Sequence, residues 1–393
     1  MDLTDLAALR LDLNNQGVRL SDELVAGGFA IALSSSGTSS EVAEGLDLVL
    51  PGGWWTNVCI APGYARTSPY ILLPAGDEDP LGLILRHRTR GDVAVAVPPT
   101  ARFRHQRTTS GFSCGEIGAV HGPWLVIAPF TPREGIALDR PRRFVGVAPH
   151  RPMTKKQWTV DEVVTCAEAA WSQAGARLVH LEAGHLLKDD GGLADLRPYI
   201  EAVKRALPTL VSVTVLPPER PEAVLELYAA GCDAVSYHLL AWDEHAAAEV
   251  APVRARFVPH QRIHAALRAA ARYFPAGATS TDLLIGLEPL PRVGEAMREL
   301  IAAGVVPNLA VFRPLPGAEG DAPHGELVPS EPLLTLMAER QRLITASPLW
   351  HSRVRGFPRT LAGFDRYQPG TRDLVYATLR RRWRAPHPEA AES

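Results

Sequence analysis

The chain has 393 residues, of which 46% are hydrophobic, and a formal net charge of −2 at pH 7. This length suggests two or three domains with a sizeable core, and the near-neutral charge excludes the electrostatic footprint of a nucleic-acid-binding protein. The sequence has no apolar run of bilayer length and no basic region at its acidic N-terminus, so we expect no membrane association and no signal peptide.

Four cysteines, Cys59, Cys114, Cys166 and Cys232, lie far apart in the sequence, and no two of them have metal-ligand spacing. Few, scattered thiols suit a reducing compartment. We therefore expect a cytoplasmic protein without a disulfide framework, in which Cys166 and Cys232 pack as core thiols.

Residues 1–130 predict a β-rich N-terminal domain. After a short amphipathic helix over residues 3–13, short apolar runs alternate with Gly-Gly, Pro-Gly and Gly-Asp turn signals, a pattern typical of strands and turns. The predicted strands include Phe29–Leu33, Leu46–Leu50, Asn57–Ile60, Tyr70–Leu73, Leu81–Leu85, Val93–Val97 and Trp124–Ile127.

Residues 131–346 predict a second domain that alternates strands and helices, after a joint rich in Pro and Arg. A capping box at Thr159–Glu162 begins one helix, and Gly231 and Gly304 end two others. The predicted strands are Phe144–Ala148, Leu178–Glu182, Leu210–Leu216, Ala234–Leu240, Thr279–Gly286 and Val306–Phe312.

Six strand–helix units favour an α/β fold, namely a partial or closed parallel (β/α)6 TIM-type barrel. A doubly wound open sheet is the alternative, but its Gly-x-Gly-x-x-Gly fingerprint is absent. Residues 347–393 predict a basic, aromatic C-terminal extension whose end is disordered.

Chemistry is expected first at the end of the strand Ala234–Leu240, because working groups lie at the carboxyl ends of parallel strands. His238 is the polar group there. Strand parity puts His180 and Glu182 on one face, so these two and His238 meet if the strands are neighbours. Two imidazoles and one carboxylate are also the ligand set of a mononuclear iron site, and hydrogen bonding inside a polar interior is the alternative.

Three stretches carry a resemblance to a known family. They are Ala229–Leu240, Ser280–Gly286 with the following Leu-Glu-Pro-Leu-Pro, and Gly304–Gly317. These stretches resemble the biotin-synthase-like radical SAM proteins, in particular the radical SAM family encoded in bacterial nitrilase gene clusters. The likeness extends to Gly17–Leu20, Ser68–Tyr70 and Glu116–Pro129 and thus covers most of the chain.

The defining C-x-x-x-C-x-x-C motif of that family is absent. The corresponding region, roughly residues 135–152, contains no cysteine, and His150 is no substitute for three thiolates. We therefore expect no [4Fe–4S] cluster and no radical chemistry.

The resemblance also implies an S-adenosylmethionine site. Leu181–Gly184 resembles the turn that receives the methionine amino group, with Glu182, Ala183 and Gly184 in contact. By the same likeness His238 contacts the cofactor, Gly286 and Glu288 lie near the adenine, and Arg313 belongs to the turn after the last strand. Leu240 stands where relatives commonly have Glu, so one polar contact is lost.

The expected function is therefore that of an enzyme which uses S-adenosylmethionine for polar group transfer or elimination on a small-molecule substrate, as a transferase or lyase of a biosynthetic pathway. His238 and Glu182 are the candidate catalytic groups. The alternatives are an inactive partner of another pathway enzyme, as a homodimer or a complex, and a mononuclear metal enzyme that uses His180, Glu182 and His238.

Overall fold

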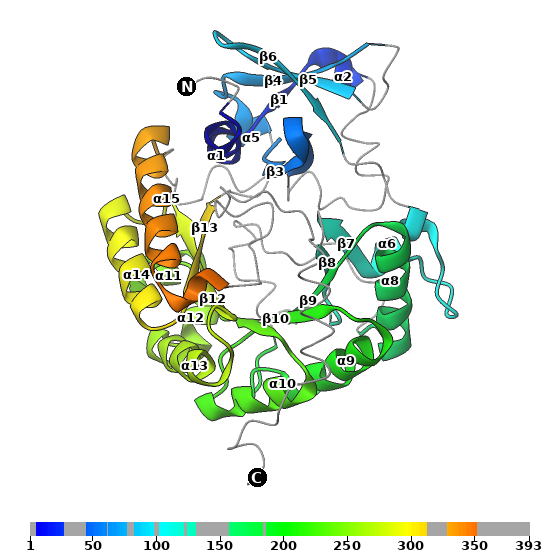
Figure 1. Cartoon of the computed structure of the whole chain (residues 1–393), viewed down its shortest axis with the longest axis vertical. Helices are drawn as coiled ribbons and strands as arrows, with labels where there is room; N and C mark the ends of the chain where they lie inside the picture. The colour runs from blue at the N-terminus through cyan, green and yellow to red at the C-terminus, as the bar shows by residue number, and fades with distance from the viewer. Residues whose placement is uncertain are drawn as a thin grey trace.

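The computed structural model describes residues 5–26, 45–60, 62–76, 82–97, 102–121, 124–130, 157–183, 186–312 and 328–351. In this part of the chain, two curled sheets face each other, and helices cover the outside of the larger one (Figure 1). The predicted strands Phe29–Leu33 and Phe144–Ala148 lie outside the described residues, as does the extension from residue 352 onwards.

The first sheet has six strands in the order β1-β4-β5-β6-β2-β3. All its neighbouring strands are antiparallel except β1 and β4. Alternation sets its core: in β2, three leucines point inward and the residues between them are half-buried. The strands are β1 (Arg19–Leu20), β2 (Leu46–Leu50), β3 (Trp54–Val58), β4 (Tyr70–Pro74), β5 (Gly82–His87) and β6 (Gly91–Ala96).

The second sheet has seven strands in the order β13-β12-β11-β10-β9-β8-β7. Every neighbouring pair is parallel except β7 with β8. The strands are β7 (Gly118–His121), β8 (Trp124–Ile127), β9 (Leu178–Ala183), β10 (Leu210–Val215), β11 (Ala234–Ser236), β12 (Thr279–Ile285) and β13 (Val306–Val311).

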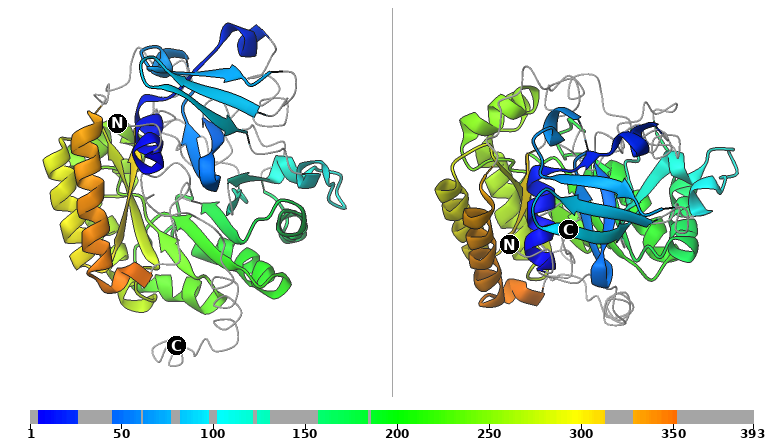
Figure 2. Two further views of the ribbon diagram at one scale, coloured as in Figure 1. Left: turned by 45° about the horizontal axis from the view of Figure 1, so that its top comes forward. Right: turned by 90° about the horizontal axis from the view of Figure 1, so that it is seen from above.

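Helices connect the parallel strands and pack on the convex face of this sheet (Figures 1 and 2). The predicted capping box begins α8: Thr159 Oγ1 accepts from the Glu162 amide at 3.3 Å, and the Glu162 carboxylate accepts from the Thr159 amide at 2.7 Å. Gly231, at φ +106°, ends α10 as predicted. The helices are α8 (Val160–Gln173), α9 (Leu193–Ala206), α10 (Val224–Ala230), α11 (Glu244–Val250), α12 (Pro252–Phe257), α13 (His260–Tyr273), α14 (Leu290–Ala302) and α15 (Ser330–Thr345).

Shorter elements complete the part of the molecule around the first sheet, here called the first lobe, and its junction with the second sheet. Helix α1 packs on both β3 and α15, so it lies between the first sheet and the outer helices of the second (Figure 2). These elements are α1 (Leu6–Gln16), α2 (Asp22–Ala26), α5 (Pro62–Ala65), α6 (Cys114–Ile117) and the 3₁₀ turns η1 (Pro51–Gly53), η2 (Arg102–His105), η3 (Pro221–Ala223) and η4 (Pro348–His351).

The expected parallel (β/α)6 TIM-type barrel is wrong. The second sheet includes an antiparallel edge strand, β7, and among the described residues the end strands β7 and β13 are not paired. The strand Trp124–Ile127, predicted to belong with the N-terminal strands, pairs in parallel with β9 instead. Its four residues are all buried, and an apolar run of this kind fits either sheet until long-range packing decides.

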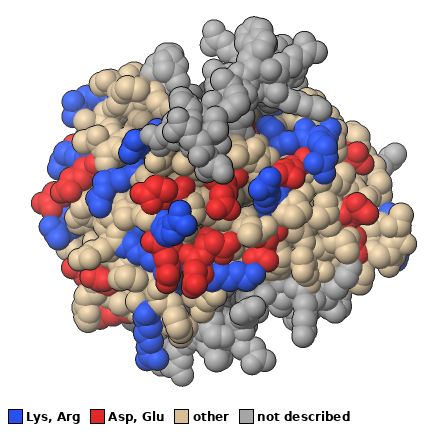
Figure 3. Space-filling model, turned by 90° about the horizontal axis from the view of Figure 1, so that it is seen from below, with Lys and Arg blue, Asp and Glu red and all other residues tan. Residues whose placement is uncertain are grey.

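The face seen from below in Figure 3 carries basic and acidic side chains interspersed with one another. Exposed ion pairs on the helices include Arg197 with Glu201 at 2.8 Å and Arg298 with Glu339 at 2.8 Å. Such exposed pairs contribute little to stability and keep the surface charge locally balanced. In the described part of the chain, no helix combines the length and apolar character needed to span a bilayer.

Candidate functional site

The concave face of the second sheet is polar, and strand register lines up its side chains. Residues of the opposite parity, such as Val179, Leu181 and Val213, are buried in the core beneath the helices. The polar side chains therefore face away from the helices. One row across four strands is Glu182, Thr214, Ser236 and Ser280, and the next rows hold His180 with Ser212, and Asp282 with Asn308.

His238 and Asp282 form a paired acid and base at the carboxyl end of this face. Nδ1 of His238 lies 2.9 Å from Oδ2 of Asp282, and the two side chains are only 18% and 23% exposed. Asn308 donates from Nδ2 to the other carboxylate oxygen of Asp282 at 3.2 Å. Sequence analysis had selected His238 but not its two partners on β12 and β13.

Electrostatics favour the charged form of each member of this pair. Burial alone would lower the pKa of His238, but the adjacent carboxylate of Asp282 and the charge of Glu182 raise the pKa above its ordinary value of 6.5. Burial would raise the pKa of Asp282, whereas His238 and Asn308 hold it below its ordinary value of 3.8. The aspartate therefore favours the protonated imidazole, which is a form suited to act as a general acid.

The chain that continues from β11 forms a bulge next to the His238–Asp282 pair. Ser236 is opposite Ser280, but Leu240 is opposite Leu283. Between these two pairs, the chain after β11 therefore has one residue more than β12. Leu240 adopts φ +74°, a left-handed conformation that is unfavourable for a branched side chain. Such strain persists only where the surroundings enforce it, and it concentrates at functional sites.

The side chain of Thr281 holds the bulge from the neighbouring strand. Its hydroxyl accepts from the Leu239 amide at 2.9 Å and donates to the Tyr237 carbonyl at 2.7 Å, which satisfies the backbone on both sides of His238. Arg254 on α12 donates to the His238 carbonyl. Thr281 is fully buried, so these bonds are shielded from water.

His180 and Glu182 lie on the same face as predicted. The imidazole of His180 contacts the hydroxyls of Ser212 at 2.8 Å and Thr214 at 3.0 Å, and its Nε2 is 3.7 Å from a Glu182 oxygen. Hydroxyls therefore occupy both ring nitrogens. Among the described residues, no three His, Cys, Asp or Glu side chains are arranged to hold a metal ion, so nothing there supports the proposed iron ligand set.

The remaining predicted cofactor residues divide into two groups. Ala183 is the buried last residue of β9, and Gly286 directly follows β12 at φ +103°. The carboxylate of Glu288 accepts from the amides of Trp242 at 2.8 Å and Asp243 at 3.0 Å, so it anchors the loop after β11. Gly184 and Arg313 lie outside the described residues.

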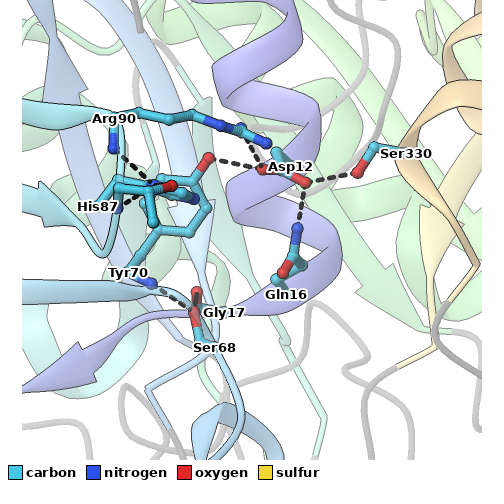
Figure 4. Close-up of polar contacts among 9 residues, drawn as sticks. Asp12, Gln16, Gly17, Ser68, Tyr70, His87, Arg90 and Ser330 are labelled. Atoms are coloured by element: carbon cyan, nitrogen blue, oxygen red, sulfur yellow. Dashed lines mark hydrogen bonds and ion pairs between the residues drawn. The ribbon is translucent and has the colours of Figure 1, made fainter. Parts of the chain in front are cut away.

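A second polar cluster, which sequence analysis missed, joins the first lobe to α15 (Figure 4). Asp12, only 2% exposed, accepts from the Tyr70 hydroxyl at 2.6 Å, the Ser330 hydroxyl at 2.5 Å and the Gln16 amide. Arg90 lies 3.6 Å from the same carboxylate. Burial and Asp12 together raise the pKa of Tyr70, so its phenol stays protonated and donates.

This cluster is a structural latch rather than a catalytic site, because each oxygen of Asp12 is already bound by protein donors. The sequence signal was a run of polar residues, Asp12, Asn14 and Asn15, that are buried although they lie on a short helix. Asn15 also donates to the Val328 carbonyl at 2.6 Å, which extends the contact to the residues before α15.

Comparisons with known proteins identify no family for this chain. A scan against protein-family models finds no match, and a search of curated proteins likewise finds none. The functional assignment therefore rests on the geometry of the concave face and on the chemistry of its side chains.

Proposed function

We propose that the concave face of the second sheet is the active site of an enzyme in which His238 transfers a proton to or from a small-molecule substrate. The observation that carries this proposal is the contact of 2.9 Å between His238 and Asp282, at the carboxyl end of a parallel strand and beside a strained bulge. Buried histidine–carboxylate pairs in such a position are suited to general acid–base catalysis.

The charges of the site favour a positively charged ligand. The face presents the carboxylates of Glu182 and Asp282 together with several hydroxyls, and none of its described strand positions is Lys or Arg. Ser236 Oγ is buried at the centre of the face and has no hydrogen-bond partner in the structure. A buried orphan hydroxyl is costly unless a ligand satisfies it.

S-adenosylmethionine, implied by the sequence resemblance, fits these groups. Its ammonium and sulfonium are cations, and Glu182 and Ser236 are the described residues suited to hold an ammonium group. When bound, it would supply an electrophilic sulfonium that supports group transfer or elimination. Glu288 is already bonded to two backbone amides, so its predicted contact near the adenine would require that anchor to be shared.

The residues around His238 have distinct roles in the proposed proton transfer. The Asp282 carboxylate, 2.9 Å from Nδ1 of His238, stabilises the imidazolium, which leaves Nε2 as the atom that exchanges a proton with the substrate. Asn308 orients Asp282, and Thr281 and Arg254 fix the backbone of His238. Partial burial of both side chains limits the access of water to the ion pair and strengthens it.

Isothermal titration calorimetry with S-adenosylmethionine at pH 7 tests this proposal. Wild-type protein is expected to bind, Glu182→Gln to bind at least about tenfold more weakly because a charge-assisted hydrogen bond is lost, and the exposed control Glu222→Gln to bind as wild type. His238→Asn is expected to retain binding and to lose conversion of the ligand when followed by chromatography. The absence of binding heat from the wild-type protein would refute S-adenosylmethionine as the ligand.

The other expectations receive less support from the structure. A non-catalytic partner protein would expose an apolar patch, but the large apolar side chains exposed in the described part, Val25 and Phe257, lie on separate helices. We retain the cytoplasmic location as a proposal, which is supported by four cysteines that form no disulfide. Sedimentation of the purified protein decides whether it forms a homodimer.

A further inference from the structure

Two cysteines far apart in the sequence meet in the hydrophobic core between the second sheet and its helices. Cys114 is the first residue of α6, and Cys166, 52 positions later, lies on the buried side of α8. Both are completely buried, and neither belongs to the concave face. The local backbone is well anchored, because Cys114 donates its amide to the Gln106 carbonyl at 2.8 Å.

The two residues are in direct contact. Cys166 Sγ donates to the Cys114 backbone carbonyl at 3.5 Å, so the two cysteines are neighbours in the core. The other cysteines are separate from this pair. Cys232 donates from its thiol to the Ala234 carbonyl at 3.0 Å, and Cys59 is buried in the first lobe next to β3. Of the four cysteines, Cys114 and Cys166 alone are therefore positioned as a pair.

The proximity of the two thiols makes them chemically unequal. Cys166 lowers the pKa of Cys114 in spite of burial, whereas Cys114 and burial raise the pKa of Cys166. Cys114 is therefore the thiol that ionises first. Since the thiolate is the nucleophile in thiol chemistry, Cys114 is the attacking group and Cys166 the resolving one.

We propose that Cys114 and Cys166 form a reversible disulfide when the protein meets a peroxide. The Cys114 thiolate attacks one oxygen of hydrogen peroxide, the O–O bond breaks, and hydroxide leaves and takes up a proton as water. The Cys166 thiol then attacks the resulting sulfenic acid and displaces a second water. Both sulfurs are oxidised and one peroxide is reduced to two waters; a dithiol reverses the reaction by exchange.

The bond would lock the antiparallel edge of the second sheet. The closed loop includes β7 and β8 and links α6 covalently to α8, which at present contact each other through packing. Cross-linking restricts the unfolded chain and stabilises the native state. Since both thiols are buried, oxidation requires a local opening, so we expect it to be slow and specific for a small oxidant.

Peptide mass spectrometry of the full chain tests this proposal. The purified protein is treated with excess hydrogen peroxide until the reaction ends, unfolded, alkylated and digested. We expect one cross-linked peptide pair containing Cys114 and Cys166, abolished by a dithiol, and a Tm about 5 °C higher than that of the reduced protein. Alkylation of both thiols after exhaustive peroxide treatment, or their conversion to sulfinic acid without a cross-link, would overturn the proposal.

Two variants provide the controls. Cys166→Ala removes the resolving thiol, so Cys114 should accumulate as a sulfenic acid that reacts with dimedone, and peroxide should no longer raise Tm. Cys232→Ala removes a buried thiol outside the pair and should retain both the cross-link and the Tm increase. Cross-linking that persists in Cys166→Ala, through another cysteine, would also contradict the assigned pair.

Discussion

Replacement of Asp12 by alanine tests whether the latch shown in Figure 4 stabilises the protein. Asp12 accepts three side-chain hydrogen bonds, from Tyr70, Gln16 and Ser330, and lies near the guanidinium of Arg90. Alanine removes the acceptor for all of them. The phenol of Tyr70 is then most affected, because Tyr70 is completely buried and water does not reach it.

The expected loss follows from these contacts. An unsatisfied buried hydroxyl costs about 2 kcal/mol, and loss of each bond to Gln16 and Ser330, which water can partly replace, costs about 1 kcal/mol. The sum is about 4 kcal/mol, within the range for breaking a buried charged contact. Asp12→Asn retains one carbonyl oxygen for Tyr70 and is expected to lose about half as much.

Urea unfolding followed by circular dichroism measures this loss. Asp5→Ala is the matched control on the same helix: Asp5 caps α1 by accepting from the Ala8 amide at 3.1 Å, and its removal should cost about 1 kcal/mol. If Asp12→Ala loses no more than Asp5→Ala, the buried carboxylate does not hold α1 to β4 and α15, and the reasoning is refuted.

Three further predictions concern the proposed catalytic pair, His238 and Asp282. Asp282→Asn should lower the pKa of His238, which NMR titration of the imidazole reports, and should reduce turnover by about 10²–10⁴-fold; an unchanged pKa would contradict the assigned contact. Thr281→Val, close to isosteric, should reduce turnover and shift the His238 resonances without loss of the fold, whereas Thr279→Val, at a buried hydroxyl without a bonding partner, should leave both unchanged. The pKa of His238 is raised in the folded state, so ionisation of His238 should stabilise the protein fully below pH 6.5, and this stabilisation should decline as the pH rises through the folded-state pKa. Urea unfolding midpoints of wild type and His238→Asn, measured over this pH range, test the prediction. A wild-type midpoint that rises with pH relative to that of His238→Asn would argue against it.

Local features of the fold were predictable from the sequence. The capping box at Thr159 and the glycine stop at Gly231 depend on hydrogen bonds within one helical turn, and both are present. Parity along one strand correctly put His180 and Glu182 on a common face.

The arrangement of the strands and the partners of His238 could not be predicted from local sequence patterns. Strand Trp124–Ile127 is an apolar run that either sheet accommodates, and only packing against β9 selects the second one. Asp282 was hidden within a predicted strand, because its importance arises from the pairing of β12 with β11, whose register brings His238 opposite it.

By itself, the sequence determined the approximate positions of strands β8 to β13 and which side chains share a face, since these depend on contacts a few residues apart. The tertiary structure alone decided which strands are neighbours, and therefore that His238 meets Asp282 and that Asp12 meets Ser330, 318 positions away. Such contacts depend on the balance of burial and loop closure over the whole chain, and no local pattern encodes that balance.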